Sequence, residues 1–352
     1  MARCLCHHKS WHLKASIAAQ HHHPYRAAYD PRHPFRLTAM PLPKLLAIGG
    51  AHIDRRGQVS GVYVPGASNP GRMSEDVGGG VFNALRNAVQ RGVEASLMSV
   101  RGADAGGENV ARAIGEARIR DLSVVFLDRA SPSYTALIDR DGEVIAGLAD
   151  MALYELVFAR QLRRSKAREE AAAADAILTD ANLPADALAR VAELASGKPL
   201  FAIAISPAKV VRLQEALPRV TCLFMNLREA ASLAATDADA GASEIAARLR
   251  AAGLGSGVVT EGGNAVTGFD ADGIFAIVPP KPTSVADATG AGDALAGATV
   301  AAMMYGKPLR QALREGIAAA LLTIGSPKAV AGISDRALAQ TLELVPQPQR
   351  VA

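Results

Sequence analysis

The strongest constraint on the fold is an alternation of short apolar runs and helical segments that continues along most of the chain. It starts with an apolar run at 44–48, a helical stretch at 81–91 and a second apolar run at 95–100. A parallel sheet covered by helices on both faces produces this order, because its strands are buried on both sides. The alternation predicts an α/β protein, a Rossmann-like three-layer α/β/α sandwich. Further strands are predicted at 122–127, 176–179, 200–205, 222–225 and 258–260, and further helices at 107–117, 153–174, 185–195, 242–252, 291–304, 309–323 and 335–344.

Two interruptions of the alternation predict a small second sheet. Residues 61–64 form a short extended segment before a loop rich in Pro, Gly and Asn. Two apolar segments at 135–138 and 144–148 flank Asp139-Arg140-Asp141-Gly142, which is a typical hairpin turn. A sheet outside the main one suits a lid over a site. The expected organisation is one domain at 41–352 with a lid from about residues 55–75 and 123–149, and a further hairpin at 265–269 and 274–278.

Charge and cysteine usage divide the chain into two parts. The formal net charge is +4, but residues 1–40 hold six Lys or Arg and one acid, so the remainder carries −1. A nearly neutral body lacks the basic footprint of a nucleic-acid-binding protein. Cys222 is the single cysteine of the body, which excludes a disulfide framework there. No apolar run approaches the roughly 20 residues that span a bilayer. We expect a cytoplasmic protein with no nucleic-acid or membrane partner.

Three hypotheses fit residues 1–40, which are rich in His, Pro and Arg and read as a disordered extension. The segment could be a basic targeting peptide. It could instead be an upstream extension of the reading frame with Met40 as the true start, which we favour because Met40 directly precedes Pro-Leu-Pro and the first strand. The third hypothesis is a metal-binding tail, with the candidate ligands His21, His22, His23, Cys4 and Cys6.

The clearest chemical signal is the run Asp-Ala-Thr-Gly-Ala-Gly-Asp-Ala-Leu-Ala-Gly at 287–297. Gly290, Ala291 and Gly292 would open a helix, where unpaired amides and the helix dipole attract an anion. Asp293 falls in the first helical turn, where a carboxylate can accept a proton from an attacking hydroxyl while the amides stabilise charge on a phosphoryl group. A plain helix start packed on a sheet is the alternative, and the length of the run favours catalysis. The chain has no Gly-x4-Gly-Lys-Ser/Thr sequence, which disfavours a P-loop protein.

Four ordered motifs resemble the ribokinase-like carbohydrate kinases of the phosphofructokinase-B type. The run at 287–297 matches their C-terminal signature, and Gly-Gly-Gly-Val-Phe-Asn at 78–83 matches their Gly-Gly-x-x-x-Asn signature. Gly-Gly-Ala-His-Ile-Asp at 49–54 is similar to their opening strand, and Asn-Leu-Arg-Glu at 226–229 to their Asn-x-x-Glu motif. The resemblance extends over about residues 44–345. It implies a ribokinase-like fold and transfer of a phosphoryl group from ATP to a sugar or nucleoside.

Shorter segments resemble the pseudouridine kinases within that family. They are Ser-Asn-Pro-Gly at 68–71, Ser-Pro-Ser-Tyr at 131–134 and Ala-Asp-Met at 149–151. The resemblance implies phosphorylation of the 5′-hydroxyl of pseudouridine. A related kinase for ribose, adenosine or a ketose is the first alternative. A non-catalytic nucleoside-binding regulator is the second, and the presence of Asp293 argues against it.

The resemblance also implies a substrate site. Asp54 would accept hydrogen bonds from the ribose 2′ and 3′ hydroxyls, with a strand-end cap as the alternative role. The side chain of Asn83 and the backbone of Gly79 and Gly80 would complete the clamp. From the lid, Tyr134 would pack on the base, although a local apolar cluster would also suit it, and Ser133 would hydrogen-bond the base. Lids in this family pair between subunits, which implies a homodimer.

Cofactor roles follow from the same resemblance. Asn226 and Glu229 would hold Mg²⁺ through water, because Mg²⁺ keeps much of its hydration shell, and they would also suit a capping box. The turn with Thr260, Gly262 and Gly263 would follow the ATP phosphates. Its next residues, Asn264-Ala265, depart from the usual Asp-Gly.

A monovalent-cation site is implied next to the predicted anion site. Asp287 and Thr289 resemble ligands of such a site, with K⁺ as the expected ion. The segment at 325–332, which would supply the later ligands, matches the family pattern poorly.

Overall fold

The structure is a computed structural model that describes residues 27–28, 38–39 and 41–351. The chain divides into two units, Met1–Pro41 and Leu42–Ala352. In the first unit, strand β1 (Ala27–Ala28) pairs antiparallel with β2 (Thr38–Ala39). The residues on which the three hypotheses for 1–40 depend, Met40 and the candidate His and Cys ligands, lie outside the described residues.

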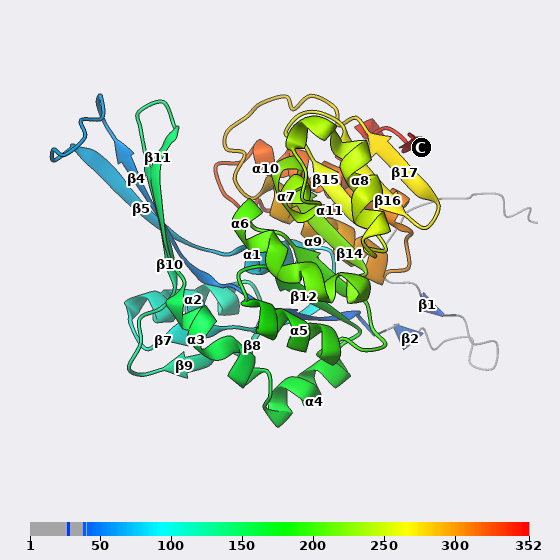
Figure 1. Cartoon of the computed structure of the whole chain (residues 1–352), viewed down its shortest axis with the longest axis horizontal. Helices are drawn as coiled ribbons and strands as arrows, with labels where there is room; N and C mark the ends of the chain where they lie inside the picture. The colour runs from blue at the N-terminus through cyan, green and yellow to red at the C-terminus, as the bar shows by residue number, and fades with distance from the viewer. Residues whose placement is uncertain (1–26, 29–37, 40, 352) are drawn as a thin grey trace, which may run out of the picture. The chain divides into compact units, whose positions relative to one another are not determined.

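A ten-stranded sheet forms the centre of the second unit (Figure 1). Neighbouring strands are parallel from β15 to β8 and antiparallel from β15 to β18. The strand order is β18 (Gln349–Arg350), β17 (Gly273–Ile277), β16 (Val266–Asp270), β15 (Gly257–Thr260), β14 (Cys222–Asn226), β13 (Leu200–Ile203), β12 (Ala176–Asp180), β3 (Lys44–Ile48), β6 (Glu94–Met98) and β8 (Arg120–Asp121).

Helices cover both faces of this sheet and bury two apolar clusters. Along β3, Leu45 and Ala47 belong to one cluster while Leu46 and Ile48 belong to the other, as strand alternation requires. The first face carries α1 (Gly80–Val89), α2 (Ala105–Glu116), α9 (Ala291–Met304), α10 (Leu309–Ile324) and α11 (Asp335–Leu344). The second carries α3 (Ala152–Gln161), α4 (Ser165–Ala173), α5 (Ala185–Leu194), α6 (Pro207–Val210), α7 (Leu227–Leu233) and α8 (Ala242–Ala251), with 3₁₀ turns at Val211–Arg219 and Ala238–Ala240.

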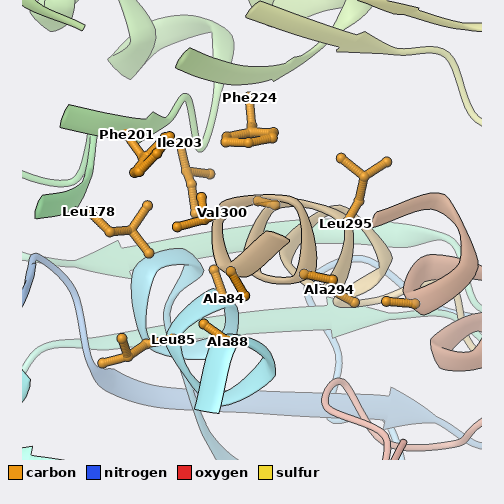
Figure 2. Close-up of a cluster of buried hydrophobic side chains, with 14 of the residues drawn as sticks. Ala84, Leu85, Ala88, Leu178, Phe201, Ile203, Phe224, Ala294, Leu295 and Val300 are labelled. Atoms are coloured by element: carbon orange, nitrogen blue, oxygen red, sulfur yellow. The ribbon is translucent and has the colours of Figure 1, made fainter. Parts of the chain in front are cut away.

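The three-layer sandwich predicted from the alternation is therefore confirmed. Figure 2 shows one of its contacts, where small side chains such as Ala84 of α1 and Ala294 of α9 let two helices lie close to strands that present Leu178, Phe201 and Phe224. No helix among the described residues combines the length and the apolar character needed to cross a membrane.

Two predicted elements differ from the structure. The helix predicted at 153–174 is broken into α3 and α4, because the chain turns at the buried Leu162 and both helices then pack on the same sheet face. The strand predicted at 122–127 is present only at 124–126, and it does not join the main sheet. The main sheet ends at β8, and β9 (Val124–Phe126) instead pairs in parallel with β7 (Val100–Gly102), which a break at Ser99 separates from β6.

A separate four-stranded sheet, the lid sheet, stands away from the main sheet (Figure 1). Its order is β11 (Val144–Asp150), β10 (Ser133–Ile138), β4 (His52–Val59) and β5 (Gly71–Gly78), with β10 and β4 parallel and the other pairs antiparallel. The hairpin around Asp139–Gly142 is present, with Gly142 at φ 92°. Residues 61–64 form no strand, because the side-chain oxygen of Asn69 accepts from the Val64 amide at 2.8 Å and closes a loop there.

Candidate active site

The predicted site motifs meet at the carboxyl ends of the parallel strands. Asn226 ends β14 and Thr260 ends β15, and the two residues are register partners. Gly49 and Gly50 follow β3, and Asp180 ends β12. Ligands of open α/β sheets bind outside these strand ends, so the motifs lie where a ligand is expected.

The segment at 287–293, which we call the Gly290 turn, leads into α9. Gly290 has φ 80°, and a Cβ atom on it would lie 2.0 Å from the Ala329 carbonyl oxygen, so only glycine fits. The first backbone amides of a helix have no acceptor within the helix, and a glycine at the N-cap has no side chain that could accept from them. The Ala291 amide donates to the Ala288 oxygen at 3.3 Å, so the amides of Gly292 and Asp293 are the better anion donors.

Asp293 is held in a polar surrounding at the start of α9. Its Oδ2 atom accepts a hydrogen bond from Asn83 Nδ2 at 2.8 Å. Burial raises its pKa to about 7; the Asn83 hydrogen bond and Arg86 oppose the rise, and the Asp180 and Asp54 carboxylates add to it. A carboxyl group that titrates near neutral pH is suited to accept and return a proton.

Arg86 fixes the orientation of Asn83. Its guanidinium donates to Asn83 Oδ1, so the amide nitrogen of Asn83 is the group that faces Asp293. Burial lowers the pKa of Arg86, and the carboxylates of Asp76, Asp293 and Asp54 oppose that change. Sequence reasoning missed Arg86, although it lies three residues after Asn83 and hence on the same helical face.

Asp54 lies at the base of the lid sheet, and two features hold it. His52 Nε2 is 3.3 Å from Asp54 Oδ1. A Cβ atom on Gly78 would lie 1.9 Å from Asp54 Oδ2, so the carboxylate occupies the space of the missing side chain. Gly79 has φ 115° and faces the Gly50 oxygen, where a Cβ would lie 2.3 Å away. The glycines of the predicted clamp therefore bring Asp54 and the start of α1 together.

Strand alternation separates the two residues predicted to reach the substrate from the lid. Tyr134 is the register partner of Asp54, so both side chains lie on the same sheet face. Ser133 pairs with the buried Ile53 and lies on the opposite face. The Tyr134 ring lies over Gly147 of the neighbouring strand, where a Cβ atom would be 2.7 Å from the Tyr134 hydroxyl. The structure therefore brings Tyr134, but not Ser133, to the side of Asp54.

Arg56 connects the lid sheet to the Gly290 turn. Its Nη1 atom donates to Asp287 Oδ2 at 2.9 Å and its Nη2 atom to Thr289 Oγ1 at 2.8 Å. The Thr289 amide donates to Asp287 Oδ1 at 2.8 Å. Burial would raise the pKa of Asp287, but the hydrogen bonds from Thr289 and Arg56 outweigh it and hold the pKa below its ordinary value. No sequence motif marks Arg56 beyond its place two residues after Asp54.

Asn226 and Glu229 form the capping box that was the alternative to a metal role. Asn226 Oδ1 accepts from the Glu229 amide at 2.9 Å, and Glu229 Oε2 accepts from the Asn226 amide at 2.7 Å. Burial raises the pKa of Glu229, and the hydrogen bonds from Asn226 oppose the rise. Within residues 41–351, no group of three or more His, Cys, Asp or Glu side chains is placed to hold a metal ion. The two side-chain oxygens at this strand end, next to the predicted ATP turn, would suit a hydrated Mg²⁺.

The predicted ATP turn follows Thr260, whose hydroxyl donates to the Met225 oxygen at 3.4 Å. Gly262 has φ 54°, and the Asn264 amide donates to the Glu261 oxygen at 2.9 Å, which closes the turn. Apart from the glycine itself and its two chain neighbours, no described residue has an atom within 4 Å of a Cβ position on Gly262 or Gly263. The turn thus offers open backbone next to the Asn226 strand end.

Asp180 is a fully buried acid that sequence reasoning did not single out. Its Oδ2 atom accepts from the amides of Gly50 at 3.3 Å and Val81 at 3.2 Å. Its Oδ1 atom accepts from the Asn182 amide at 3.1 Å. Burial raises its pKa. Asp180 therefore joins the loop after β3 to the start of α1, and its place at the end of an apolar strand was the available signal.

Comparisons with known proteins agree with this geometry. The sequence model of the pfkB family carbohydrate kinases matches residues 42–336. The pseudouridine kinase of Escherichia coli strain K12 is 28% identical over 273 residues, which are 77% of this chain and 87% of that protein.

Solved structures share the fold. A carbohydrate kinase from Agrobacterium tumefaciens is 44% identical with a TM-score of 0.78, over 88% of this chain and 99% of that one. The Arabidopsis thaliana ribokinase complexed with ribose and ATP is 20% identical with a TM-score of 0.74, over 86% of this chain and 99% of that one. The ribokinase-like fold predicted from the motifs is confirmed.

Proposed function

Because the chain belongs to the pfkB family of carbohydrate kinases, we propose that it phosphorylates the 5′-hydroxyl of a ribosyl nucleoside with ATP, and that pseudouridine is its preferred acceptor. The observation that carries this proposal is the pair of carboxylates, Asp54 and Asp293, that both act on Arg86. Asp54 lies on the lid side and Asp293 at the start of α9, and both interact electrostatically with Arg86. The similarity to the Escherichia coli pseudouridine kinase supports the choice of acceptor.

In the proposed complex, the acceptor lies between the lid sheet and the start of α1. Asp54 accepts hydrogen bonds from the ribose 2′ and 3′ hydroxyls, and the side chain of Asn83 with the backbone of Gly79 and Gly80 completes the clamp. Tyr134, on the same lid face as Asp54, packs against the base. Ser133 lies on the other face and has no role in this proposal.

The proposed step is an in-line phosphoryl transfer. The ionised Asp293 carboxylate takes the proton from the 5′-hydroxyl, and the freed oxygen attacks the γ-phosphorus. The bond between the γ-phosphorus and the β,γ-bridging oxygen breaks, and ADP leaves with that electron pair. The backbone amides of Gly292 and Asp293 at the Gly290 turn stabilise the charge on the transferred group. The Ala291 amide can join them only if its hydrogen bond to the Ala288 oxygen opens.

ATP binding is proposed along the turn with Thr260, Gly262 and Gly263, whose backbone is open toward the strand ends. Asn226 and Glu229 would hold Mg²⁺ through water in this proposal, because Asn226 Oδ1 and Glu229 Oε2 already accept backbone hydrogen bonds in the capping box. Bound Mg²⁺ would neutralise phosphate charge. We also propose a cytoplasmic location, because Cys222, the single cysteine of the body, is a free buried thiol.

A panel of acceptors tests this proposal. ADP formation is measured with pseudouridine, uridine, adenosine, ribose and fructose, and the product is identified by mass spectrometry. We expect the highest kcat/KM with pseudouridine and a 5′-monophosphate product. A preference for ribose, adenosine or fructose would replace the acceptor and keep the kinase. Binding without ADP formation for every compound would favour the nucleoside-binding regulator.

We also propose that a second copy of the chain covers the outer face of the lid sheet. Met73 and Leu137 both lie against Gly57 on the face opposite Asp54, and Met73 is 66% exposed. Leu148 is 72% exposed and shares this face by strand alternation. Sedimentation should show a dimer that the double variant Met73→Glu, Leu148→Glu converts to a monomer. A wild-type monomer at all concentrations would contradict this.

A further inference from the structure

The face of β4 that carries Asp54 also carries Arg56, because side chains two residues apart point to the same side of a strand. Arg55, between them, points to the opposite face and pairs with Glu75 of β5 at 3.0 Å. From its face, Arg56 reaches the Gly290 turn and contacts both Asp287 and Thr289. A basic side chain of the lid sheet, Arg56, therefore contacts Asp287 and Thr289, the residues that resemble a monovalent-cation site.

The oxygens of Asp287 are already engaged. Oδ2 accepts from Arg56 and Oδ1 accepts from the Thr289 amide, each within 2.9 Å. The Thr289 hydroxyl oxygen accepts from the same guanidinium. An arginine keeps its charge at all relevant pH values and matches two acceptors in one plane. A monovalent ion at Asp287 would have to displace these donors, so the residues present do not fit such an ion.

We propose that Arg56 supplies the positive charge at Asp287, in place of a monovalent cation, and so makes phosphoryl transfer independent of K⁺. Arg56 is a positioning residue in this role, because it acts through Asp287 and Thr289 on the shape and charge of the Gly290 turn. The same contacts join the lid strand to that turn, so the charge is in place only while the lid sheet rests against it.

The kinetic test of this inference rests on the proposed kinase function, whereas a thermal test does not. Initial rates are measured for wild type, Arg56→Ala and Arg56→Lys in potassium chloride and in tetramethylammonium chloride of equal ionic strength. We expect equal wild-type rates in both salts. Arg56→Ala should lose about tenfold in kcat/KM without K⁺, the loss expected for one charge-assisted contact, and should recover part of it with K⁺. Arg56→Lys keeps the charge and should stay insensitive to K⁺.

Arg55→Ala is the matched control, because it removes a neighbouring lid arginine that points away from the Gly290 turn and pairs with Glu75 across the sheet. Whatever its absolute rate, it should show no difference between the two salts. The thermal test compares unfolding temperatures in the two salts without substrates. We expect K⁺ to stabilise Arg56→Ala specifically and to leave wild type and Arg55→Ala unchanged.

Each result decides the inference. A wild-type enzyme that requires K⁺ for turnover, or that K⁺ stabilises as strongly as Arg56→Ala, would overturn it. So would an Arg56→Ala variant as active as wild type without K⁺. If no acceptor is phosphorylated, the proposed function fails, but K⁺-specific stabilisation of Arg56→Ala alone would still support the inference, and its absence would refute it.

Discussion

Asp293 owes its chemistry to its neighbours more than to its place in a motif. Burial raises its pKa, and the nearby Asp180 and Asp54 carboxylates favour its neutral form. Asn83 and Arg86 act in the opposite direction. The balance leaves a carboxyl group that is half-ionised near pH 7, where a proton acceptor works best.

Replacing this carboxyl tests its role directly. Asp293→Asn keeps the shape and removes the base, so we expect kcat to fall by about 10²-fold or more while the KM for the acceptor changes little. Steady-state kinetics measure both constants. Asp272→Asn, an exposed acid in the β16–β17 turn, is the control and should leave both unchanged. A variant of Asp293 that keeps most of its kcat would exclude the base assignment.

The pH profile gives a second test at the same residue. Only the ionised form accepts a proton, so kcat/KM should fall as the pH drops below about 7. Asp180→Asn removes a carboxylate that raises the pKa of Asp293, so the acid limb should move to lower pH. Circular dichroism would verify that this variant is folded. An acid limb unchanged in a folded Asp180→Asn would contradict the electrostatic account.

At the scale of elements, glycines set the approach of the lid strands to α1. Gly78→Ala would place a methyl group 1.9 Å from Asp54 Oδ2, so the carboxylate must move. We expect the acceptor KM to rise about tenfold or more, as for the loss of one charged hydrogen-bond partner, with the KM for ATP nearly unchanged. Gly61→Ala, in the open loop of the same sheet, is the control. Equal effects of both substitutions would show that the lid responds to any added methyl group.

The elements also show what could be predicted from the sequence. The parallel strands were predictable, since buried strands such as β12 and β14 are continuous apolar runs. Strand β5 was not, because Arg72, Met73 and Ser74 are exposed and leave no apolar period. The motif residues Asp54, Asn83 and Asp293 were found by their spacing. The other site residues could not be predicted in this way. Arg56 and Asp180 contact residues more than 90 positions away in sequence, and a local pattern does not record such contacts. Arg86 is a single charge on a helix face, which has no pattern of its own.

At the scale of the whole molecule, the ionisation of Asp293 costs stability. Its folded pKa of about 7 lies above the ordinary value of about 3.9, so the folded state binds the proton more tightly. The protonated Asp293 carboxyl therefore contributes to the free energy of unfolding of the wild type at low pH. This contribution is lost as the pH rises from about 4 to about 7. Asp293→Asn cannot ionise and avoids this loss.

Thermal unfolding across that pH window tests the prediction. We expect the unfolding temperature of Asp293→Asn to exceed that of wild type by about 2 °C or more at neutral pH, and the difference to shrink as the pH falls toward about 4. Asp272→Asn again serves as the control. A difference that is constant with pH, or that grows as the pH falls, would contradict the raised pKa.

The two faces of the lid sheet carry different residues, because successive side chains of a strand point to opposite faces. On β4, Asp54 and Arg56 face the Gly290 turn, while Arg55 lies on the opposite face, to which β5 and β11 contribute the exposed side chains of Met73 and Leu148. A substitution on one face leaves the other intact, but inserting or deleting a single residue exchanges the two faces. Homologous lids can therefore diverge at exposed positions of the outer face such as Met73 and Leu148, whereas the spacing between Asp54 and Arg56 is fixed, and alignments of related chains should show no gaps there.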